Sequence, residues 1–355
     1  MQLNSNVAVA TDEDLLAEAE SLFSKGLVDS IRDRGHGFIE QGGEGAFMFD
    51  SNGNQYIDCL TSASTYNLGR NHKAIIGELQ QASRETDQGL FVTTSEEKVA
   101  LAERLSEFVP GPLNCLLMQV VRGEPFDGAC KLARGHTGRG ELIAIKGSWH
   151  GQTGFAVSLT DRDDRQDFGS TMPETRILEK EDVIGAISKK TAAVIVEPVQ
   201  VENHCRSLGR DYLQRLRAAC DKRGALLIFD ETQTGFGRTG RKFAYEALGV
   251  TPDILIIGEA ITNGVFPMAG MLYTAELKNF FEGKVAIHII TFGLIIFVSN
   301  RNANDWLSYL RNHPMTSFPG RDVFTITAFC KNKVWIPVSN FSKRKHVTTQ
   351  IHIIA

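Results

Sequence analysis

Short apolar runs alternate with amphipathic stretches through the middle of this 355-residue chain. The apolar runs predict strands over residues 142–145, 192–196, 225–229 and 254–257. Apolar positions at helical spacing predict helices over residues 75–86, 95–108 and 125–137, and a further helix with Tyr212, Leu213, Leu216, Ala219 and Cys220 on one face. Nearly continuous apolar strands separated by amphipathic helices indicate a parallel sheet covered on both faces. The pattern therefore predicts an α/β protein.

The N-terminal part follows a different pattern. Residues 11–33 are acidic and carry apolar residues at helical spacing, which predicts a helix that packs on the main body or on a partner subunit. Residues 45–58 form a strand–turn–strand pattern, in which the polar cluster at 51–54 supplies the turn of a hairpin. We expect residues 1–70 to form a segment of their own.

The last 62 residues break the α/β order. Residues 294–355 hold eight Lys/Arg against two acids, a balance of +6, whereas the whole chain carries −4. They contain aromatic and β-branched runs but no repeat or clear periodicity. The predicted organisation is therefore residues 1–70, a large domain over 71–293, and a C-terminal segment over 294–355. That segment is either a divergent ending or the product of a truncated or shifted reading frame.

Composition excludes several classes of protein. The small net charge gives no sign of a nucleic-acid or membrane surface, and no apolar run reaches the roughly 18 residues of a membrane span. The first residues lack the basic and apolar regions of a secretory signal. The six cysteines are scattered without a CxxC pair, which is typical of buried thiols in a reducing compartment and not of a disulfide framework or zinc site. We expect a soluble, cytoplasmic protein.

Two stretches carry the chemistry. Residues 226–240 join an apolar strand to Asp-Glu-Thr-Gln and a glycine-rich turn, and residues 252–260 join another apolar strand to Gly-Glu-Ala. Together they resemble the core of the class III pyridoxal-phosphate aminotransferases of the ornithine and omega-amino-acid type, and the resemblance covers roughly residues 35–293. It implies the α/β architecture of the fold-type I transferases, with a parallel-rich, seven-stranded sheet and helices on both faces. The family's mixed α/β C-terminal lobe is not recognisable after residue 293, so that lobe is incomplete or divergent.

Glu259 stands where the family has the lysine that holds the cofactor as an imine. A carboxylate cannot form that bond, and no lysine lies between Lys242 and Lys278 to replace it. The lysine also acts as the base that moves a proton between substrate and cofactor. A glutamate can in principle do the second task but not the first.

Asp230 and Gln233 match the family's Asp-Glu-x-Gln motif. A carboxylate beside the pyridine nitrogen stabilises its protonated form, which makes the ring an electron sink. The alternative for Asp230 is a plain helix N-cap at a strand-to-helix turn. The glycine-rich turn that follows favours the cofactor role.

Two further motifs belong to the same resemblance. Trp149 and His150 follow the strand at 142–145, and the family stacks an aromatic residue at this place on the cofactor ring. The alternatives are a core tryptophan and a histidine that only shapes the turn. Thr291 lies in His-x-x-Thr-Phe-Gly, and in the family this threonine binds the cofactor phosphate of the opposite subunit.

Glu197 lies in a Glu-Pro-x-Gln motif. In ornithine-type members this glutamate pairs with an arginine of the C-terminal lobe and gates the substrate carboxylate site. The segment that supplies the arginine is not recognisable here. Glu197 is therefore either a substrate-site residue without that partner or a solvated loop acid.

The phosphate loop also departs from the family. Residues 121–125 stand where Ser-Gly-Ser-Glu-Ala is expected, so hydroxyl donors are missing at 121 and 123 and Pro125 removes an amide donor. Gly123 of the loop and the N-terminus of the following helix still offer amides to a phosphate, and Arg122 adds a guanidinium suited to phosphate. The alternative is a surface arginine. Because the loop and position 259 flank the same cofactor in this family, we expect Arg122 to pair with Glu259 when no phosphate is bound.

These observations give three hypotheses. The leading one is an aminotransferase-like protein that binds pyridoxal or pyridoxamine phosphate, non-covalently if at all, with amino transfer between small molecules as the ancestral activity. The second is an inactive scaffold, or pseudoenzyme, that dimerises through the family's surface. The third is a lyase-type reaction on pyridoxamine phosphate with Glu259 as base. We expect a homodimer in which Asp230, Gln233 and Trp149 converge at the carboxyl edge of the sheet, with Glu259 on the wall of the site.

Overall fold

The computed structural model describes residues 11–33, 35, 37–85 and 94–281. The described chain divides into two compact units, one with the residues up to Thr61 and Gly69–Asn71, the other with Ser62–Leu68 and the residues from His72 onward. The three segments predicted from the sequence stay a prediction, because residues 294–355 lie outside the described part. No helix among the described residues is long and apolar enough to cross a membrane.

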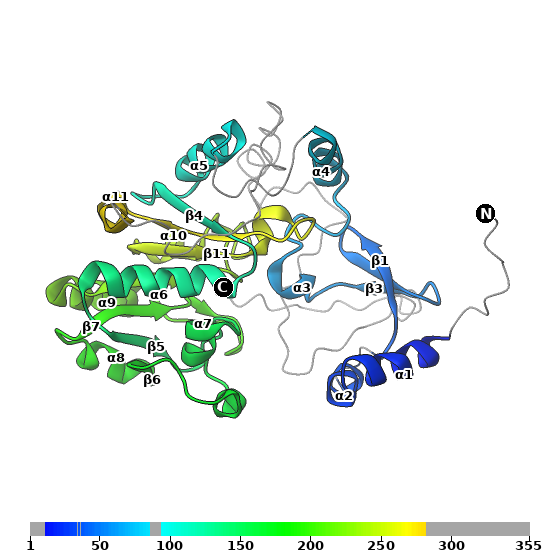
Figure 1. Ribbon diagram of the computed structural model, residues 1–355, viewed down its shortest axis with the longest axis horizontal. Helices are drawn as coiled ribbons and strands as arrows, with labels where there is room; N and C mark the ends of the chain where they lie inside the picture. The colour runs from blue at the N-terminus through cyan, green and yellow to red at the C-terminus, as the bar shows by residue number, and fades with distance from the viewer. Residues whose placement is uncertain (1–10, 34, 36, 86–93, 282–355) are drawn as a thin grey trace, which may run out of the picture. The chain divides into compact units, whose positions relative to one another are not determined.

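The first unit holds two helices and a small sheet, drawn in blue in Figure 1. The elements are α1 (Asp12–Leu22), α2 (Lys25–Asp33), β1 (Glu40–Glu44), β2 (Phe47–Asp50) and β3 (Gln55–Ile57). The predicted hairpin is confirmed, since β2 and β3 pair antiparallel. The single helix predicted over 11–33 is instead two helices. Thr11 caps α1 by accepting a hydrogen bond from the Asp14 amide, and the helix ends at Leu22.

The second unit contains the remaining elements. Its helices are α4 (Lys73–Glu85), α5 (Glu96–Phe108), α6 (Gly123–Thr137), α7 (Gly154–Leu159), α8 (Lys180–Ala186), α9 (Arg210–Arg223), α10 (Ala244–Leu248) and α11 (Ala275–Lys278), with 3₁₀ turns at Asp163–Phe168, Glu259–Thr262 and Asn279–Phe281. Its strands are β4 (Cys115–Gln119), β5 (Glu141–Ile145), β6 (Thr175–Leu178), β7 (Thr191–Val196), β10 (Leu226–Asp230), β11 (Ile254–Ile257) and β12 (Ala269–Tyr273), with a small pair of β8 (Val199–Gln200) and β9 (Arg206–Ser207). The short turn α3 (Thr61–Ser64) lies at the boundary of the two units and is left-handed, with positive φ at all four residues.

One seven-stranded sheet organises this unit, in the order β4-β12-β11-β10-β7-β5-β6. Strands β11, β10, β7, β5 and β6 are parallel to one another. Strand β12 runs antiparallel to both β11 and β4, so β4 points the same way as the parallel set. The predicted parallel-rich sheet of seven strands is confirmed.

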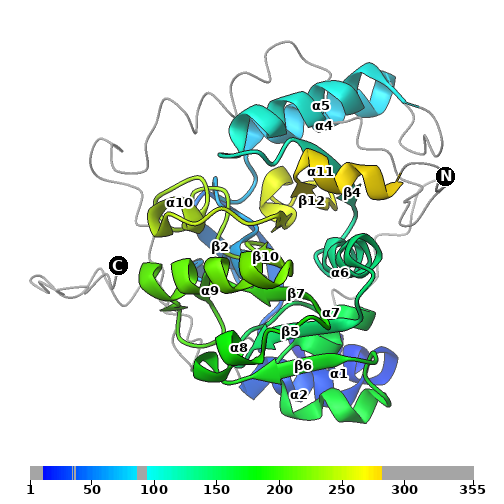
Figure 2. The same ribbon diagram turned by 90° about the vertical axis from the view of Figure 1, so that its left-hand side faces the viewer.

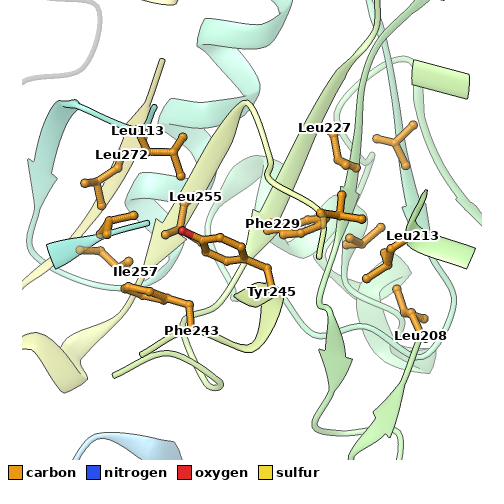
Figure 3. Packing of buried hydrophobic residues seen from close by; sticks show 14 of the residues in the cluster. Leu113, Leu208, Leu213, Leu227, Phe229, Phe243, Tyr245, Leu255, Ile257 and Leu272 are labelled. Carbon is orange, nitrogen blue, oxygen red and sulfur yellow. The ribbon is translucent and has the colours of Figure 1, made fainter. Parts of the chain in front are cut away.

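Alternate residues of each strand enter two separate cores, because successive side chains point to opposite faces of a sheet. On β10, Leu227 and Phe229 belong to the core that also contains Leu213 of α9, as Figure 3 shows. Ile228 belongs to the other core, with Phe126 of α6. Helices α9 and α6 therefore cover opposite faces of the sheet (Figure 2). Both faces are apolar, so polar groups are concentrated where the strands end.

Candidate functional site at the carboxyl edge of the sheet

Five strands of the sheet carry polar residues at their carboxyl ends or in the loops that follow. Arg122 follows β4, Trp149 follows β5, Glu197 follows β7, Asp230 ends β10 and Glu259 follows β11. Because these strands point in one direction, their carboxyl ends lie at the same edge of the sheet. This is the edge at which open α/β sheets bind ligands.

Asp230 and His150 form the buried centre of the site. His150 Nδ1 lies 2.7 Å from Asp230 Oδ2, and neither side chain is exposed. Asp230 Oδ1 accepts a hydrogen bond from the Thr232 amide. The His150 ring stacks on Phe126 at 4.7 Å between centroids. The next described helix after Asp230 is α10, which begins only at Ala244, so the helix N-cap alternative for Asp230 is wrong.

His150 does more than shape a turn. Its backbone amide donates to Thr160 Oγ1 at 2.9 Å, while its ring reaches Asp230 from a different strand. Its Nε2 atom is buried and has no hydrogen-bond partner within the described chain. The ring therefore orients the Asp230 carboxylate and keeps one polar atom available for a further contact.

Glu197 lies beneath the loop that carries Trp149. Its Oε2 atom accepts the Trp149 amide at 2.9 Å, and the residue is only 1% exposed, so the solvated-loop alternative is wrong. Burial and the neighbouring Asp230 raise the pKa of Glu197 well above its usual value. Gln200 donates from Nε2 to Lys146 O and Ser148 Oγ in the same loop. The Glu-Pro-x-Gln segment therefore positions Trp149, a task that its sequence motif did not indicate.

Arg122 and Glu259 form the expected ion pair. Arg122 Nη2 lies 2.9 Å from Glu259 Oε2, and Nε lies 3.1 Å from the same oxygen. The Arg122 backbone amide donates to Glu259 Oε1 at 3.1 Å. Both side chains are less than one-fifth exposed, which excludes the surface-arginine alternative. The guanidinium carbon also lies 5.6 Å from the centre of the Trp149 ring, within reach of a cation–π contact.

The N-terminus of α6 lies directly after Arg122. The side chain of Thr153 covers Gly123, and a Cβ atom at Gly123 would lie 2.6 Å from Thr153 Oγ1. Thr153 also donates to the Gly123 carbonyl at 2.9 Å. The hydroxyl-bearing residue that the family pattern has at position 123 therefore does not fit here unless Thr153 moves. Sequence reasoning missed Thr153, although it lies three residues after His150.

Two buried amide side chains complete the edge. Gln233 is 2% exposed, and its Nε2 atom has no partner in the part of the chain that the structure describes. Gln119, the last residue of β4, is fully buried, and neither of its amide atoms has a described partner. Buried polar groups are normally hydrogen-bonded, so unpaired ones indicate a place for a polar ligand or group. Gln119 was not predicted, because a single glutamine after an apolar run gives no signal.

The remaining predicted residue, Thr291, lies outside the described residues. Trp149, Asp230, Glu259 and Arg122 all lie at one edge, and contacts join them in two sets. One set runs from Glu259 through Arg122 to Trp149, and the other joins His150 to Asp230, with Trp149 and His150 adjacent in the chain. Trp149 therefore links the two sets.

The implied B6 cofactor fits one end of this site and not the other. Asp230, with a buried carboxylate oriented by His150, suits a protonated pyridine nitrogen, and Gln233, three residues further on, has an amide nitrogen without a described partner. At position 259 the carboxylate cannot bind the cofactor covalently. At the α6 N-terminus the Arg122 amide and guanidinium that would hold a phosphate are bound to Glu259. The site as it stands therefore has groups suited to a cationic ring but lacks both the covalent anchor and a free phosphate cradle.

Comparison with known proteins identifies the family of this chain and agrees with its fold. The aminotransferase class-III family model matches residues 32–293. An uncharacterised aminotransferase of Archaeoglobus fulgidus is 36% identical over 72% of this chain and 61% of its own length. The 5-aminovalerate aminotransferase DavT of Pseudomonas aeruginosa is 32% identical over 76% of this chain and 67% of its own. An acetylornithine aminotransferase of Methanopyrus kandleri is 36% identical over 68% and 62%.

Solved structures give the same result. An ornithine aminotransferase of Toxoplasma gondii superposes with a TM-score of 0.75 at 25% identity and covers 86% of this chain and 72% of its own. A second structure of that enzyme records partial occupancy of pyridoxal phosphate at its active site. The chain spans 61–67% of the length of the curated relatives above. It belongs to the class III aminotransferases, a family whose cofactor is pyridoxal or pyridoxamine phosphate.

Proposed function

We propose that this chain recognises the pyridine end of a B6 cofactor without covalent attachment, and that ordinary transamination is lost or strongly reduced. The observation that carries the proposal is the ion pair of Glu259 with Arg122 at the position of the family's lysine. A carboxylate cannot replace the amine as a covalent anchor. Lys242, the nearest preceding lysine, is committed elsewhere, since its Nζ donates to Phe108 O at 3.0 Å.

The retained half of the site supports ring recognition. Asp230 is held by His150 and the Thr232 amide, so its carboxylate is oriented before any ligand arrives. Trp149 is anchored through its amide by Glu197 and offers an aromatic surface. These residues bind and orient a cationic ring, and they supply no nucleophile.

The ancestral activity in this proposal is amino transfer between small molecules, with omega-amino acids of the 5-aminovalerate or acetylornithine kind as donors, after the names of the relatives. A homodimer and a cytoplasmic location are part of the proposal. The third hypothesis, with Glu259 as the base of a lyase, is less favoured. A carboxylate that already accepts hydrogen bonds from three N–H groups of Arg122 has little acceptor capacity left for a substrate proton.

The same ion pair favours a second candidate function, a non-catalytic subunit that keeps the family's fold. Absorption spectra separate the two candidates. Purified protein incubated with pyridoxal phosphate, desalted and scanned should retain cofactor absorbance if the ring site works, and a scaffold should retain none.

Borohydride treatment followed by mass measurement tests covalent attachment. We expect no lysine adduct, because reduction traps only a cofactor that is bound to an amine. A stoichiometric adduct on any lysine would falsify the proposal. The Asp230→Ala variant is the matched control for the spectrum, since it should lose ring absorbance while the mass result stays unchanged.

A further inference from the structure

We propose that Glu259 is an internal anion that occupies the phosphate-binding end of α6, so that a phosphate monoester enters this site only by displacing it. The inference rests on the proposed function, because the family places its cofactor phosphate at this loop. The added claim is that Glu259, which stands at the position of the family's lysine, itself blocks the phosphate site.

The contacts of Glu259 are those of a bound anion. One carboxylate oxygen accepts the Arg122 backbone amide at 3.1 Å, and the other accepts two guanidinium nitrogens at 2.9 and 3.1 Å. A backbone amide at a helix N-terminus together with a bidentate guanidinium is a typical set of phosphate donors. The carboxylate therefore satisfies the groups that a phosphate oxygen needs.

Three further backbone amides of this loop are also engaged. Glu124 Oε2 accepts the amides of Val120 and Val121, at 2.8 and 3.4 Å. The Glu124 amide donates to the Val121 carbonyl at 3.0 Å, and Pro125 has no amide hydrogen. Glu124 stands at the glutamate of the family pattern, so its contacts belong to the loop itself. Glu259, in contrast, has no counterpart in the family pattern, and its removal frees the donors of Arg122.

The backbone around position 259 favours this placement. Gly258 passes close to Thr232, and a Cβ atom at Gly258 would lie 2.8 Å from the Thr232 carbonyl oxygen. Glu259 then begins a 3₁₀ turn whose next residues, Ala260 to Thr262, are buried. The side chain thus starts from a tightly held backbone, and displacement means rotation of the side chain and not movement of the loop.

Inorganic phosphate is the probe, because it lacks the ring and does not report on the Asp230 end. We would titrate it at constant ionic strength into the wild type, Glu259→Ala and Glu259→Gln, and measure heat and tryptophan emission. Glu259→Ala should bind phosphate at least tenfold more tightly than the wild type. Glu259→Gln, which keeps the shape but not the charge, should lie between them.

Three control variants assign the effect to Arg122 and Glu259. Glu179→Ala removes a glutamate that pairs with Lys146 on the surface, and it should bind phosphate as the wild type does. Arg122→Ala combined with Glu259→Ala should lose the increase in phosphate affinity, because the donors that Glu259→Ala frees are those of Arg122. Trp149→Phe should remove the emission change if that change reports on Arg122, which lies over the Trp149 ring.

Equal phosphate affinity in the wild type and Glu259→Ala, with both proteins folded by circular dichroism, would overturn the inference. Pyridoxamine, which has the ring but no phosphate, separates this failure from failure of the proposed function. If pyridoxamine still binds but Glu259→Ala does not raise the affinity for phosphate, only the inference about Glu259 is rejected. Loss of pyridoxamine binding in all variants rejects the ring site.

Discussion

His150 and Asp230 are hydrogen-bonded in the interior of the protein, although eighty residues separate them in the chain. One residue follows β5 and the other ends β10, and β7 lies between these strands in the sheet. The contact therefore joins the loop after β5 to the end of β10, across an intervening strand. A change at His150 therefore acts on the orientation of the Asp230 carboxylate and, under the proposed function, on ring binding.

We expect His150→Ala to destabilise the protein by roughly 2–4 kcal/mol, because it leaves a buried carboxylate oxygen without its partner. His150→Asn, which keeps a donor, should cost less. Urea unfolding gives the measurement, with exposed His136→Ala as the matched control. If His150→Ala lowered the free energy of unfolding no more than His136→Ala does, the contact would not contribute to stability.

A double-mutant cycle tests the Arg122–Glu259 pair. Removing one member of a fully buried pair costs about 3–5 kcal/mol, and partial exposure here lowers the expectation for Arg122→Ala to about 2–3 kcal/mol. Adding Glu259→Ala should restore part of the loss, since no charge is then left uncompensated. Strict additivity of the two single changes in unfolding experiments would contradict coupling.

The exchange of both residues should restore covalent attachment. Glu259→Lys alone places an ammonium beside the Arg122 guanidinium, so we expect it to be less stable than the wild type. Combining it with Arg122→Gly, which returns the family's residue to the loop, should recover stability and give a lysine adduct after incubation with pyridoxal phosphate and borohydride. Mass measurement locates the adduct. Absence of an adduct at position 259 in a folded double variant would mean that this position is not the family's lysine site.

Stability should depend on pH through Glu231. Burial raises the pKa of Glu231 to about 7, even though the amides of Ala244 and Tyr245 donate to its carboxylate. The folded-state pKa is above the unfolded value of 4.5, so the folded protein binds the extra proton and loses stability as the pH rises from about 4.5 to about 7.

The Glu231→Gln variant lacks this titration. Relative to the variant, the wild type should lose about 3 kcal/mol of unfolding free energy across that window. Exposed Glu276→Gln is the control and should keep the wild-type pH profile. A constant difference between wild type and Glu231→Gln from pH 4.5 to 7 would contradict the assignment.

A homodimer is expected from the motif around Thr291, since two-fold pairing is the commonest oligomer geometry. Light scattering at micromolar concentration should give twice the chain mass of 39.2 kDa. A monomer under these conditions would remove Thr291 from the candidate site, because its partner loop belongs to the other subunit.

The strongest elements of the fold were predictable from local pattern. Strands β5, β7, β10 and β11 are continuous apolar runs, because both faces of each are covered. Strand β6 was missed because it lies at the sheet edge, and its Arg176 is exposed. Strand β12 was missed because Gly270 interrupts the apolar pattern; the Leu117 carbonyl would lie 3.1 Å from a Cβ there.

The residues of the site were predictable only where their charge or a sequence motif indicated them. The Arg122–Glu259 pair followed from two departures of opposite charge in loops that the family places together. Contacts that depend on tertiary packing were not predictable. The burial of Glu197 beneath Trp149 and the cover of Gly123 by Thr153 join loops that local pattern does not relate.

The apolar faces of the strands and the polar ends of the same strands are occupied by different residues. Leu227 and Phe229 hold β10 in the core, whereas Asp230, the next residue, belongs to the site. Mutational drift at the loop positions therefore need not disturb the packing that makes the chain fold. An ancestor could exchange its lysine for a glutamate and compensate with one arginine while the scaffold survived. By the same reasoning, few substitutions separate this chain from one that could bind its cofactor covalently, and they fall on side chains outside the two hydrophobic cores.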